Sequence, residues 1–243
     1  MTAVFVHGVP ETSSLWDPLV AELDRDDTAQ LALPGFGSAL PDGFEPTMHR
    51  YADWLADELR RFDEVDLVGH DWGALLSMRV LADQPANVRT WVIDSGDLGP
   101  DHKWHDAART WQTPGDGEAV MDAWVASSVE DRAATLEGVG APADGALEMA
   151  RHLDAEMGRA ILGLYRSAVD VGREWGPGID SWTAPGMVVG SALDPFRSPR
   201  LITRLAERTG AEVLELSECG HWWMLERPAE VARALESFWS RHP

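Results

Sequence analysis

The sequence has a single cysteine, Cys219, so neither an intramolecular disulfide nor a cysteine-based zinc site is available to it. Basic residues are also few: 20 Lys and Arg stand against 41 Asp and Glu, for a net charge of −21 at pH 7. Such a charge repels nucleic acids and anionic membrane surfaces. No segment is apolar for long enough to span a membrane, and the start MTAVFVHG lacks signal-peptide features. We therefore expect a cytoplasmic protein that binds neither nucleic acid nor membrane.

Tyrosine is scarce as well, with only Tyr51 and Tyr165, whereas tryptophan occurs twelve times. Several tryptophans fall away from the expected core positions, which indicates an aromatic-lined pocket for a small apolar organic substrate. The hydrophobic fraction of 44% and the charged fraction of 25% are those of an ordinary globular protein. A chain of 243 residues is long enough for one α/β domain with an insertion.

Short β-rich runs alternate with helical patterns in both end regions of the chain. We expect strands at 3–6, 29–33, 65–68, 88–93, 186–189 and 212–216. We expect helices at 14–23, 47–62, 74–82, 198–209 and 228–239. Strand–helix alternation of this kind predicts a mostly parallel sheet flanked by helices.

The middle of the chain shows helical patterns and no strand, at 103–112, 117–126, 130–137 and 144–170. A helical segment of this size between two α/β parts is typical of a functional lid. We therefore predict an α/β core over residues 1–99 and 181–243, with a helical cap inserted over 100–180.

Three side chains that could form a nucleophile, an acid and a base follow predicted strands. Asp71 lies at the tip of the turn GHDWG, Asp194 lies in the loop GSALDPF, and His221 lies in the loop SECGHWWMLERP. Because the carboxyl ends of parallel strands meet at one edge of a sheet, we expect the three to lie close together. Their order along the chain is that of α/β-hydrolases.

Five segments resemble the α/β-hydrolase superfamily, and they occur in the family's order: HGVPETSSLW (7–16), LPGFGSA (33–39), GHDWGALL (69–76), GSALDPF (190–196) and GHWWMLERP (220–228). GHDWG carries aspartate where G-x-S-x-G carries serine. In this it is similar to epoxide hydrolases and to haloalkane or haloacetate dehalogenases. The resemblance implies the α/β-hydrolase fold with an inserted helical cap. It also implies that the sequence starts at the family's usual third strand, without the edge hairpin.

An aspartate at this position suits attack on a saturated carbon, because an ionised carboxylate can displace a leaving group and form an ester. Asp71 is then the nucleophile, His221 the general base and Asp194 the acid that orients the base. Asp94 and Asp97 stay open as alternative positions for the acid. By the oxyanion-hole logic of the fold, backbone N–H groups of Val9 and Trp72 bind the ester oxygen during hydrolysis. The scheme needs no metal and no cofactor.

The leaving group separates the two activities that the resemblance implies. Tyr165, in GLYRSA, resembles the cap tyrosine that protonates an epoxide oxygen, and His105 lies where related enzymes carry a second donor. A halide instead needs N–H donors. The candidate donors are tryptophans: Trp72, Trp104, Trp111 and Trp124. Val9 stands where many haloalkane dehalogenases have asparagine, so the sequence favours an epoxide hydrolase.

Other interpretations stay open at this point. A haloalkane or haloacetate dehalogenase is the main alternative. An ester or lactone hydrolase and a non-catalytic ligand receptor are further alternatives, because one fold hosts many functions. Whether the protein forms a homodimer is also left open by the sequence.

Overall fold

The computed structural model describes every residue from Met1 to Pro243. Six strands form one sheet in the order β2-β1-β3-β4-β5-β6, and every neighbouring pair is parallel. The strands are β1 Thr2–Val6, β2 Thr28–Leu31, β3 Val65–Gly69, β4 Val88–Ile93, β5 Gly186–Ser191 and β6 Glu212–Leu216. The predicted parallel sheet is therefore confirmed.

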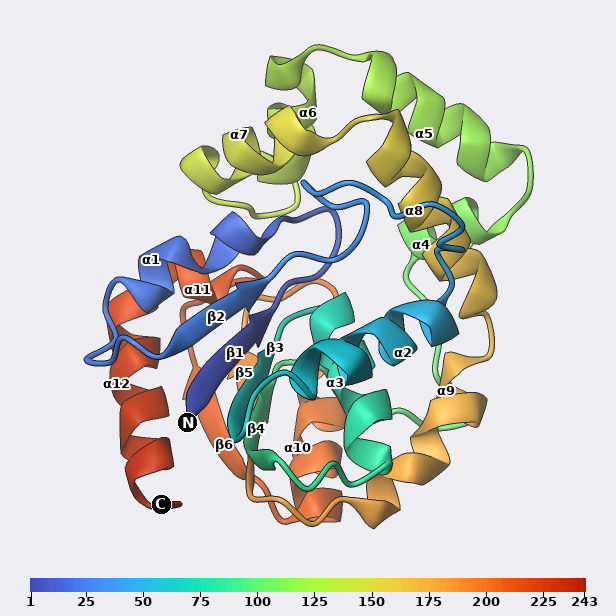
Figure 1. The fold of residues 1–243 in the computed structure, drawn as a ribbon. Coiled ribbons are helices and arrows are strands. Elements are labelled where there is room, and N and C mark those ends of the chain that lie inside the picture. Colours follow the sequence, from blue (N-terminus) through green and yellow to red (C-terminus); the bar gives the residue numbers. More distant parts are fainter.

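Helices cover both faces of the sheet, with α1 and α12 on one face and α2, α3 and α10 on the other (Figure 1). Alternate residues of each strand supply the two cores: Val4 and Val6 of β1 pack on the α2–α3 side, and Ala3 and Phe5 pack on the α12 side. The helices are α1 Asp17–Val20, α2 Met48–Leu59, α3 Trp72–Ala82, α10 Pro199–Thr209 and α12 Pro228–Ser240.

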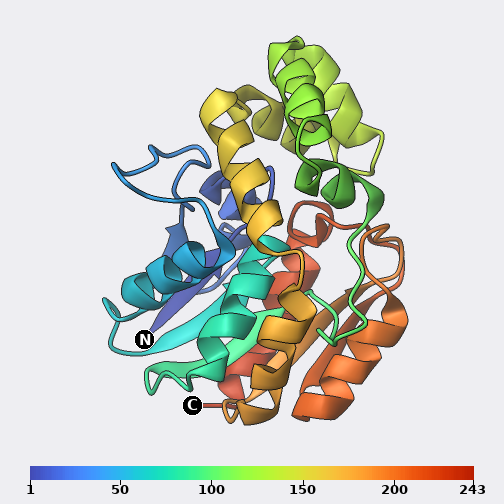
Figure 2. The ribbon, with the colours of Figure 1, turned by 90° about the vertical axis from the view of Figure 1, so that its right-hand side faces the viewer.

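A helical insertion joins β4 to β5. Its elements are α4 Asp106–Gln112, α5 Asp116–Ala126, α6 Val129–Glu137, α7 Ala143–His152, α8 Ala155–Ser167, α9 Val171–Trp175 and the 3₁₀ helix η2 Gly176–Ser181. Helices α4–α8 lie beyond the carboxyl ends of the strands (Figure 2). The last element, η2, packs instead on α3 and α10 of the core. The boundary of the cap at residue 180 therefore stays a prediction.

Two predicted helices differ in the structure. The segment 144–170 is broken between α7 and α8 because Asp154 begins a new helix, its side chain accepting a hydrogen bond from the Met157 backbone N–H at 2.8 Å. The segment 14–23 becomes a 3₁₀ helix, η1 (Ser13–Trp16), followed by the four-residue α1. Pro18 is tolerated there because it lies in the first turn of α1. A further short helix, α11 (Trp223–Glu226), precedes α12. None of the helices is both long and apolar enough to cross a membrane.

Candidate active site

The site lies where the strand order reverses. From β1 the chain proceeds to β2 on one side, and from β3 it proceeds to β4 on the other, which opens a crevice at the carboxyl ends of the two neighbouring strands. The loop after β1 carries Val9, and the turn after β3 carries Asp71. Both reach this crevice from adjacent strands.

Asp71 occupies a strained turn between β3 and α3. Its φ of 50° and ψ of −115° are unusual for a residue other than glycine, and such outliers concentrate at functional sites. The surrounding backbone is close enough to require glycine. A Cβ on Gly8 would lie 2.5 Å from Asp71 Oδ1, and one on Gly73 would lie 2.0 Å from the Val6 carbonyl oxygen. The G-x-D-x-G spacing therefore serves to bring the turn against the β1 loop.

The carboxylate of Asp71 lies in a strongly electropositive setting. Val9 donates its backbone N–H to Oδ1 at 3.1 Å, and the Trp72 backbone N–H also favours the charged form. Burial alone would raise the pKa of Asp71, but Arg197, and after it His221 and His70, outweigh burial and lower that pKa. Asp71 is thus ionised at neutral pH, and the Val9 backbone N–H binds one of its oxygens.

The structure brings His221 and Asp194 to the same edge. His221 Nδ1 lies 2.8 Å from Asp194 Oδ2, and His221 Nε2 lies 3.9 Å from Asp71 Oδ2. With Nδ1 engaged by Asp194, Nε2 is the ring nitrogen that faces Asp71. The alternative acids make other contacts than His221: Asp94 binds His70 and the Asp71 backbone N–H, and Asp97 pairs with arginines of α10.

Arg197 is a site residue that the sequence analysis did not identify. Its Nη2 lies 2.9 Å from Asp71 Oδ2, and its side chain is only 15% exposed. It follows Asp194 by three residues in the loop after β5, so it shares the sheet edge with the predicted acid. One arginine among nineteen in a polar loop carries no periodic or motif signal. The ion pair is made by tertiary structure alone.

Behind Asp71 lies a buried chain of charges formed by Glu11, His70 and Asp94. Both ring nitrogens of His70 contact carboxylates, Nδ1 with Asp94 and Nε2 with Glu11 at 2.9 Å. Carboxylates only accept, so both nitrogens must donate and His70 is an imidazolium. Burial would lower the pKa of His70, but Asp94 and Glu11 raise it well above 6.5.

The same two carboxylates hold the two loops of the site. Glu11 Oε2 accepts the Gly8 backbone N–H at 2.7 Å, and Asp94 Oδ1 accepts the Asp71 backbone N–H at 3.1 Å. Two adjacent indoles complete the cluster, Trp222 donating to Glu11 at 2.9 Å and Trp223 donating to Asp94 at 2.6 Å. The cluster therefore fixes the β1 loop relative to the β3 turn.

Ligand atoms of Glu11, His70 and His221 lie within 4.8 Å of one another, a spacing that a metal ion could bridge. A metal needs a deprotonated imidazole nitrogen. Both ring nitrogens of His70 donate to carboxylates, so this residue offers no lone pair to a metal ion.

The side chains of Asp71 and His221 open into an apolar cavity of about 440 Å³ beneath the cap. Asp71 and His221 lie at its base, and α4, α5, α6 and α8 supply most of its walls. Its lining includes Val9, Pro10, His105, Trp111, Trp124, Leu136, Tyr165, Phe196 and Trp222. Such a cavity suits a small, largely apolar molecule.

His105 and Tyr165 line this cavity, as the resemblance implied, on α4 and α8. His105 is the N-cap of α4, and its Nδ1 accepts the Ala108 backbone N–H at 3.2 Å, so the neutral ring carries its proton on Nε2. Burial lowers the pKa of His105, which keeps the ring neutral. Burial, and after it Asp71, raise the pKa of Tyr165 well above 10.

Of the four predicted tryptophan donors, Trp111 and Trp124 line the cavity, and Trp72 and Trp104 do not. Trp104 does not line the cavity; its indole N–H donates to the Ala168 carbonyl at 2.8 Å, so it is not free to bind a leaving group. Trp72 stacks on Trp104 and packs edge-on against Tyr165, with ring centroids 5.3 Å apart for the second pair. Its buried Nε1 lacks a hydrogen bond of good geometry, but the Trp72 indole N–H points to Tyr165 and opposes the rise in the pKa of that phenol.

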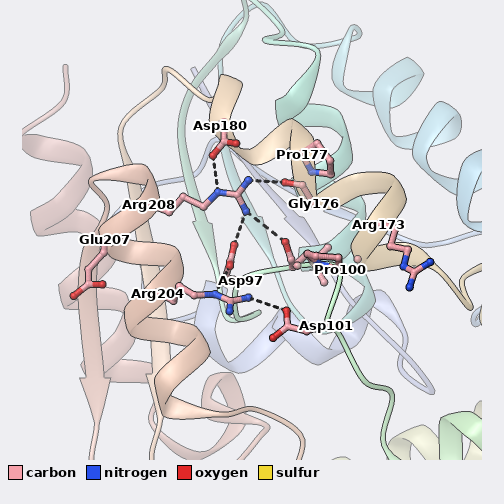
Figure 3. Close-up of a pocket in the computed structure, with 13 residues that line it drawn as sticks. Asp97, Pro100, Asp101, Arg173, Gly176, Pro177, Asp180, Arg204, Glu207 and Arg208 are labelled. Carbon is pink, nitrogen blue, oxygen red and sulfur yellow. Dashed lines mark hydrogen bonds and ion pairs between the residues drawn. The ribbon is translucent and has the colours of Figure 1, made fainter.

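A larger cavity, of about 760 Å³, lies away from these residues, between the loop after β4, η2 and α10 (Figure 3). Several of its charges form ion pairs with one another. Arg208 pairs with Asp97 and Asp180 and donates to the Gly176 carbonyl at 2.8 Å, and Arg204 pairs with Asp97. This cavity has no nucleophile or base near it. Its ion pairs join the insertion to the core.

The model of the alpha/beta hydrolase family matches residues 3–234. The chain belongs to the α/β hydrolase family. Its sheet, flanking helices and inserted helical region are accordingly those of the α/β-hydrolase fold, as the sequence predicted.

Individual relatives of this α/β hydrolase include dehalogenases. A haloalkane dehalogenase of Mycolicibacterium paratuberculosis (strain ATCC BAA-968 / K-10) is 34% identical over 101 residues, a match that covers 39% of this chain and only 34% of that protein. Among solved structures, haloalkane dehalogenase DbeA from Bradyrhizobium elkani USDA94 superposes with a TM-score of 0.76 at 23% identity, covering 99% of this chain and 91% of that one. E-2-(acetamidomethylene)succinate hydrolase gives 0.75 at 21% identity, covering 98% and 91%. At such identities, likeness to solved structures shows the fold alone.

Proposed function

We propose that this α/β hydrolase is a dehalogenase that works through a covalent ester on Asp71. One observation carries the proposal: an ionised aspartate, in place of serine, occupies the strained turn with His221 Nε2 3.9 Å from its Oδ2. A haloalkane dehalogenase that is 34% identical over 101 residues supports the same chemistry.

The reaction divides into displacement and hydrolysis. Asp71 Oδ2 attacks the carbon that bears the halogen, and the carbon–halogen bond breaks with its electron pair on the departing halide. A water molecule then attacks Cγ of the new ester while His221 Nε2 takes its proton. The Val9 and Trp72 backbone N–H groups stabilise negative charge on Oδ1. Collapse breaks the bond from Cγ to the alkyl oxygen, and His221 returns the proton to the alcohol.

Donors above Asp71 suit a halide better than an epoxide oxygen. A halide is a weak base that needs hydrogen-bond donors, and Tyr165 and the Nε2–H of His105 line the cavity. An epoxide oxygen needs a proton, and the raised pKa of Tyr165 makes that phenol a weaker acid. The second tyrosine lies in the core, where Tyr51 donates to the Pro34 carbonyl at 2.7 Å. The epoxide hydrolase interpretation, which the sequence favoured, is therefore less well supported.

Trapping of the ester tests the proposal. In His221→Gln, displacement proceeds and hydrolysis stops, so 1-bromobutane or bromoacetate should release one bromide per protein and add the alkyl group to the peptide that contains Asp71. Mass spectrometry and halide release measure both. The matched control Asp71→Asn should give no adduct and lower kcat about 10⁴-fold or more.

Three results would redirect the assignment. Labelling of Asp71 by styrene oxide, with no labelling by halides, would restore the epoxide hydrolase interpretation. Turnover of nitrophenyl esters in the wild-type protein without an Asp71 adduct would favour an esterase. Binding without any turnover would favour a ligand receptor.

A further inference from the structure

Trp72 lies between the nucleophile and the proposed halide donor Tyr165, but it does not reach the cavity. Its side chain is 0% exposed and forms no part of the cavity wall, whereas Tyr165 lines the cavity. The sequence offered Trp72 as a candidate halide donor. Packed as it is, its indole cannot donate directly to a halide in the cavity, so any effect of Trp72 on the leaving group must pass through another residue.

The indole N–H of Trp72 points to Tyr165. The two rings are nearly perpendicular, with centroids 5.3 Å apart. The N–H lacks a hydrogen bond of good geometry to any protein atom, and its effect is to oppose the rise in the pKa of the Tyr165 phenol. In proteins without bound substrate, catalytic hydrogen bonds are often long, and they shorten only in the complex. The Trp72 N–H is thus available to the Tyr165 oxygen when negative charge develops there.

Neighbouring aromatic rings hold Trp72 and Tyr165 in place. Trp104 stacks on Trp72 with centroids 5.6 Å apart, and it contacts Tyr165 with centroids 5.1 Å apart. The N–H of Trp104 is itself fixed by the Ala168 carbonyl at 2.8 Å. Trp111 packs on Tyr165 from α4, with centroids 4.9 Å apart. Both rings are therefore positioned before a substrate binds.

The direction of the Tyr165 O–H follows from this arrangement. A phenol oxygen can accept a hydrogen bond while its single hydrogen is donated elsewhere. Because the Trp72 N–H approaches the oxygen, the hydrogen is left to donate into the cavity that Tyr165 lines. A hydroxyl that accepts one hydrogen bond also becomes a better donor of the next, because linked hydrogen bonds polarise one another.

We propose that Trp72 is a positioning residue that acts on the leaving halide through Tyr165. The hydrogen-bond chain runs from the Trp72 indole N–H to the Tyr165 oxygen, and from the Tyr165 O–H to the halide. As the carbon–halogen bond breaks and the halide takes its electron pair, both hydrogen bonds shorten, and no proton is transferred. This inference rests on the proposed function, since it takes the leaving group to be a halide.

Trp72 also contacts the nucleophile, through its backbone. Its N–H favours the charged form of Asp71, and Trp72 is the first residue of α3. Tyr165 lies on α8 of the insertion. The contact between the two rings therefore sets the distance between the nucleophile and the halide donor, and displacement depends on such fixed geometry.

A double-mutant cycle with 1-chlorobutane tests the chain. Tyr165→Phe should lower kcat/KM for chloride release about 100-fold, because the halide loses a donor. Trp72→Phe should lower it about 10-fold. The double variant should equal Tyr165→Phe within about 2-fold, since Trp72 then has nothing to act through. Two independent donors would instead multiply the losses to about 1,000-fold, and that result would overturn the inference.

Trp104→Phe is the matched control, because the Trp104 indole contacts the same two rings while a backbone carbonyl binds its N–H. Chloride is more basic than bromide, so its departure depends more on hydrogen-bond donors. The ratio of kcat/KM for 1-bromobutane to that for 1-chlorobutane should rise about 3-fold or more in Trp72→Phe. It should keep the wild-type value in Trp104→Phe. An equal rise in both variants would mean that Trp72 acts by packing alone.

A measurement on the wild-type protein does not depend on the folding of the tryptophan variants. In a proton–nitrogen correlation spectrum, saturating sodium bromide should move the Trp72 indole resonance and leave the Trp104 resonance in place, because only the Trp72 N–H changes its hydrogen bond. In Tyr165→Phe, bromide should leave the Trp72 resonance unmoved. No movement in the wild-type protein, or equal movement in Tyr165→Phe, would overturn the inference.

The two proposals fail in distinguishable ways. A trapped adduct on Asp71, together with multiplied losses in the double variant, would retain the dehalogenase and reject the role of Trp72. No adduct with any halide, together with a double variant that equals Tyr165→Phe on styrene oxide, would reject the dehalogenase and retain the action of Trp72 through Tyr165.

Discussion

At the scale of single residues, two buried aspartates next to histidines have different tasks. Asp194 accepts a hydrogen bond from His221, whose other nitrogen faces the nucleophile. Asp94 binds His70, the Trp223 indole and the backbone of the turn. The first interaction determines which nitrogen of a base is free, and the second holds a loop in place. Substitution by asparagine should separate these roles.

Asp194→Asn should lower kcat by about 10³- to 10⁴-fold, because an amide N–H offered to His221 Nδ1 moves the ring proton to Nε2 and removes the base. The free energy of unfolding should change far less. Asp94→Asn should instead lower that free energy by about 3 kcal/mol, since it leaves a buried imidazolium with one counterion. Steady-state bromide release and urea denaturation measure the two effects. A larger activity loss in Asp94→Asn would place the orienting acid at Asp94.

At the scale of elements, the loop after β1 and the turn after β3 act as one unit. Gly8 and Asp71 donate their backbone N–H groups to Glu11 and Asp94, and His70 lies between the two carboxylates. The Val9 N–H, which we propose as the oxyanion donor, is thus held in place relative to Asp71 by Glu11, His70 and Asp94. Neither loop contains all three of these charged residues. Protonation of His70 couples these contacts to pH.

The coupling has a defined sign. Because the folded-state pKa of His70 is raised above the ordinary 6.5, its stabilisation is fully present below pH 6.5 and declines as pH rises through the folded value. The difference in free energy of unfolding between the wild-type protein and His70→Gln should therefore be largest near pH 6 and smaller at pH 9. Urea denaturation of both proteins at the two pH values measures it. A difference that grows toward pH 9 would mean that His70 is neutral in the folded state.

At the scale of the whole molecule, the insertion that forms the roof of the active site is anchored at its far end by charge. η2 closes the insertion against α10, where Arg208 contacts Asp180, the Gly176 carbonyl and the buried Asp97 (Figure 3). Separately, α8 is tied to core loops, for Leu40 donates its backbone N–H to Glu156 at 3.0 Å. The insertion is thus attached to the core in two places: through α8 near the Asp71 site, and through η2 at the other end of the core.

Arg208→Met should lower the free energy of unfolding by about 2 kcal/mol, because Asp97 keeps Arg204 as a partner but loses one of its two cations. Arg241→Met is the matched control: Arg241 pairs with Glu212 at the surface, and its removal should cost less than about 1 kcal/mol. Thermal or urea unfolding measures both. Equal effects would show that the network in Figure 3 contributes no more than a surface ion pair.

What the sequence by itself determined is the local and periodic part of this protein. Six strands, the parallel sheet and the start of α2 at Thr47, whose hydroxyl accepts the Arg50 N–H at 3.2 Å, follow from patterns within a few residues. The turn GHDWG was likewise recognisable from the sequence, because neighbouring atoms lie so close to its two glycines that a Cβ would not fit there.

Tertiary structure decided which side chains meet. No local pattern predicts the partners of Arg197, Glu11 and Trp104. Arg197 pairs with Asp71, Glu11 binds the Gly8 N–H in the loop after β1, and Trp104 donates its N–H to a backbone carbonyl. These contacts join loops that follow different strands, or a loop to a distant helix. The spacing of residues along the chain does not predict the distance between such segments. That distance is determined by the register of the sheet and the packing of the cap.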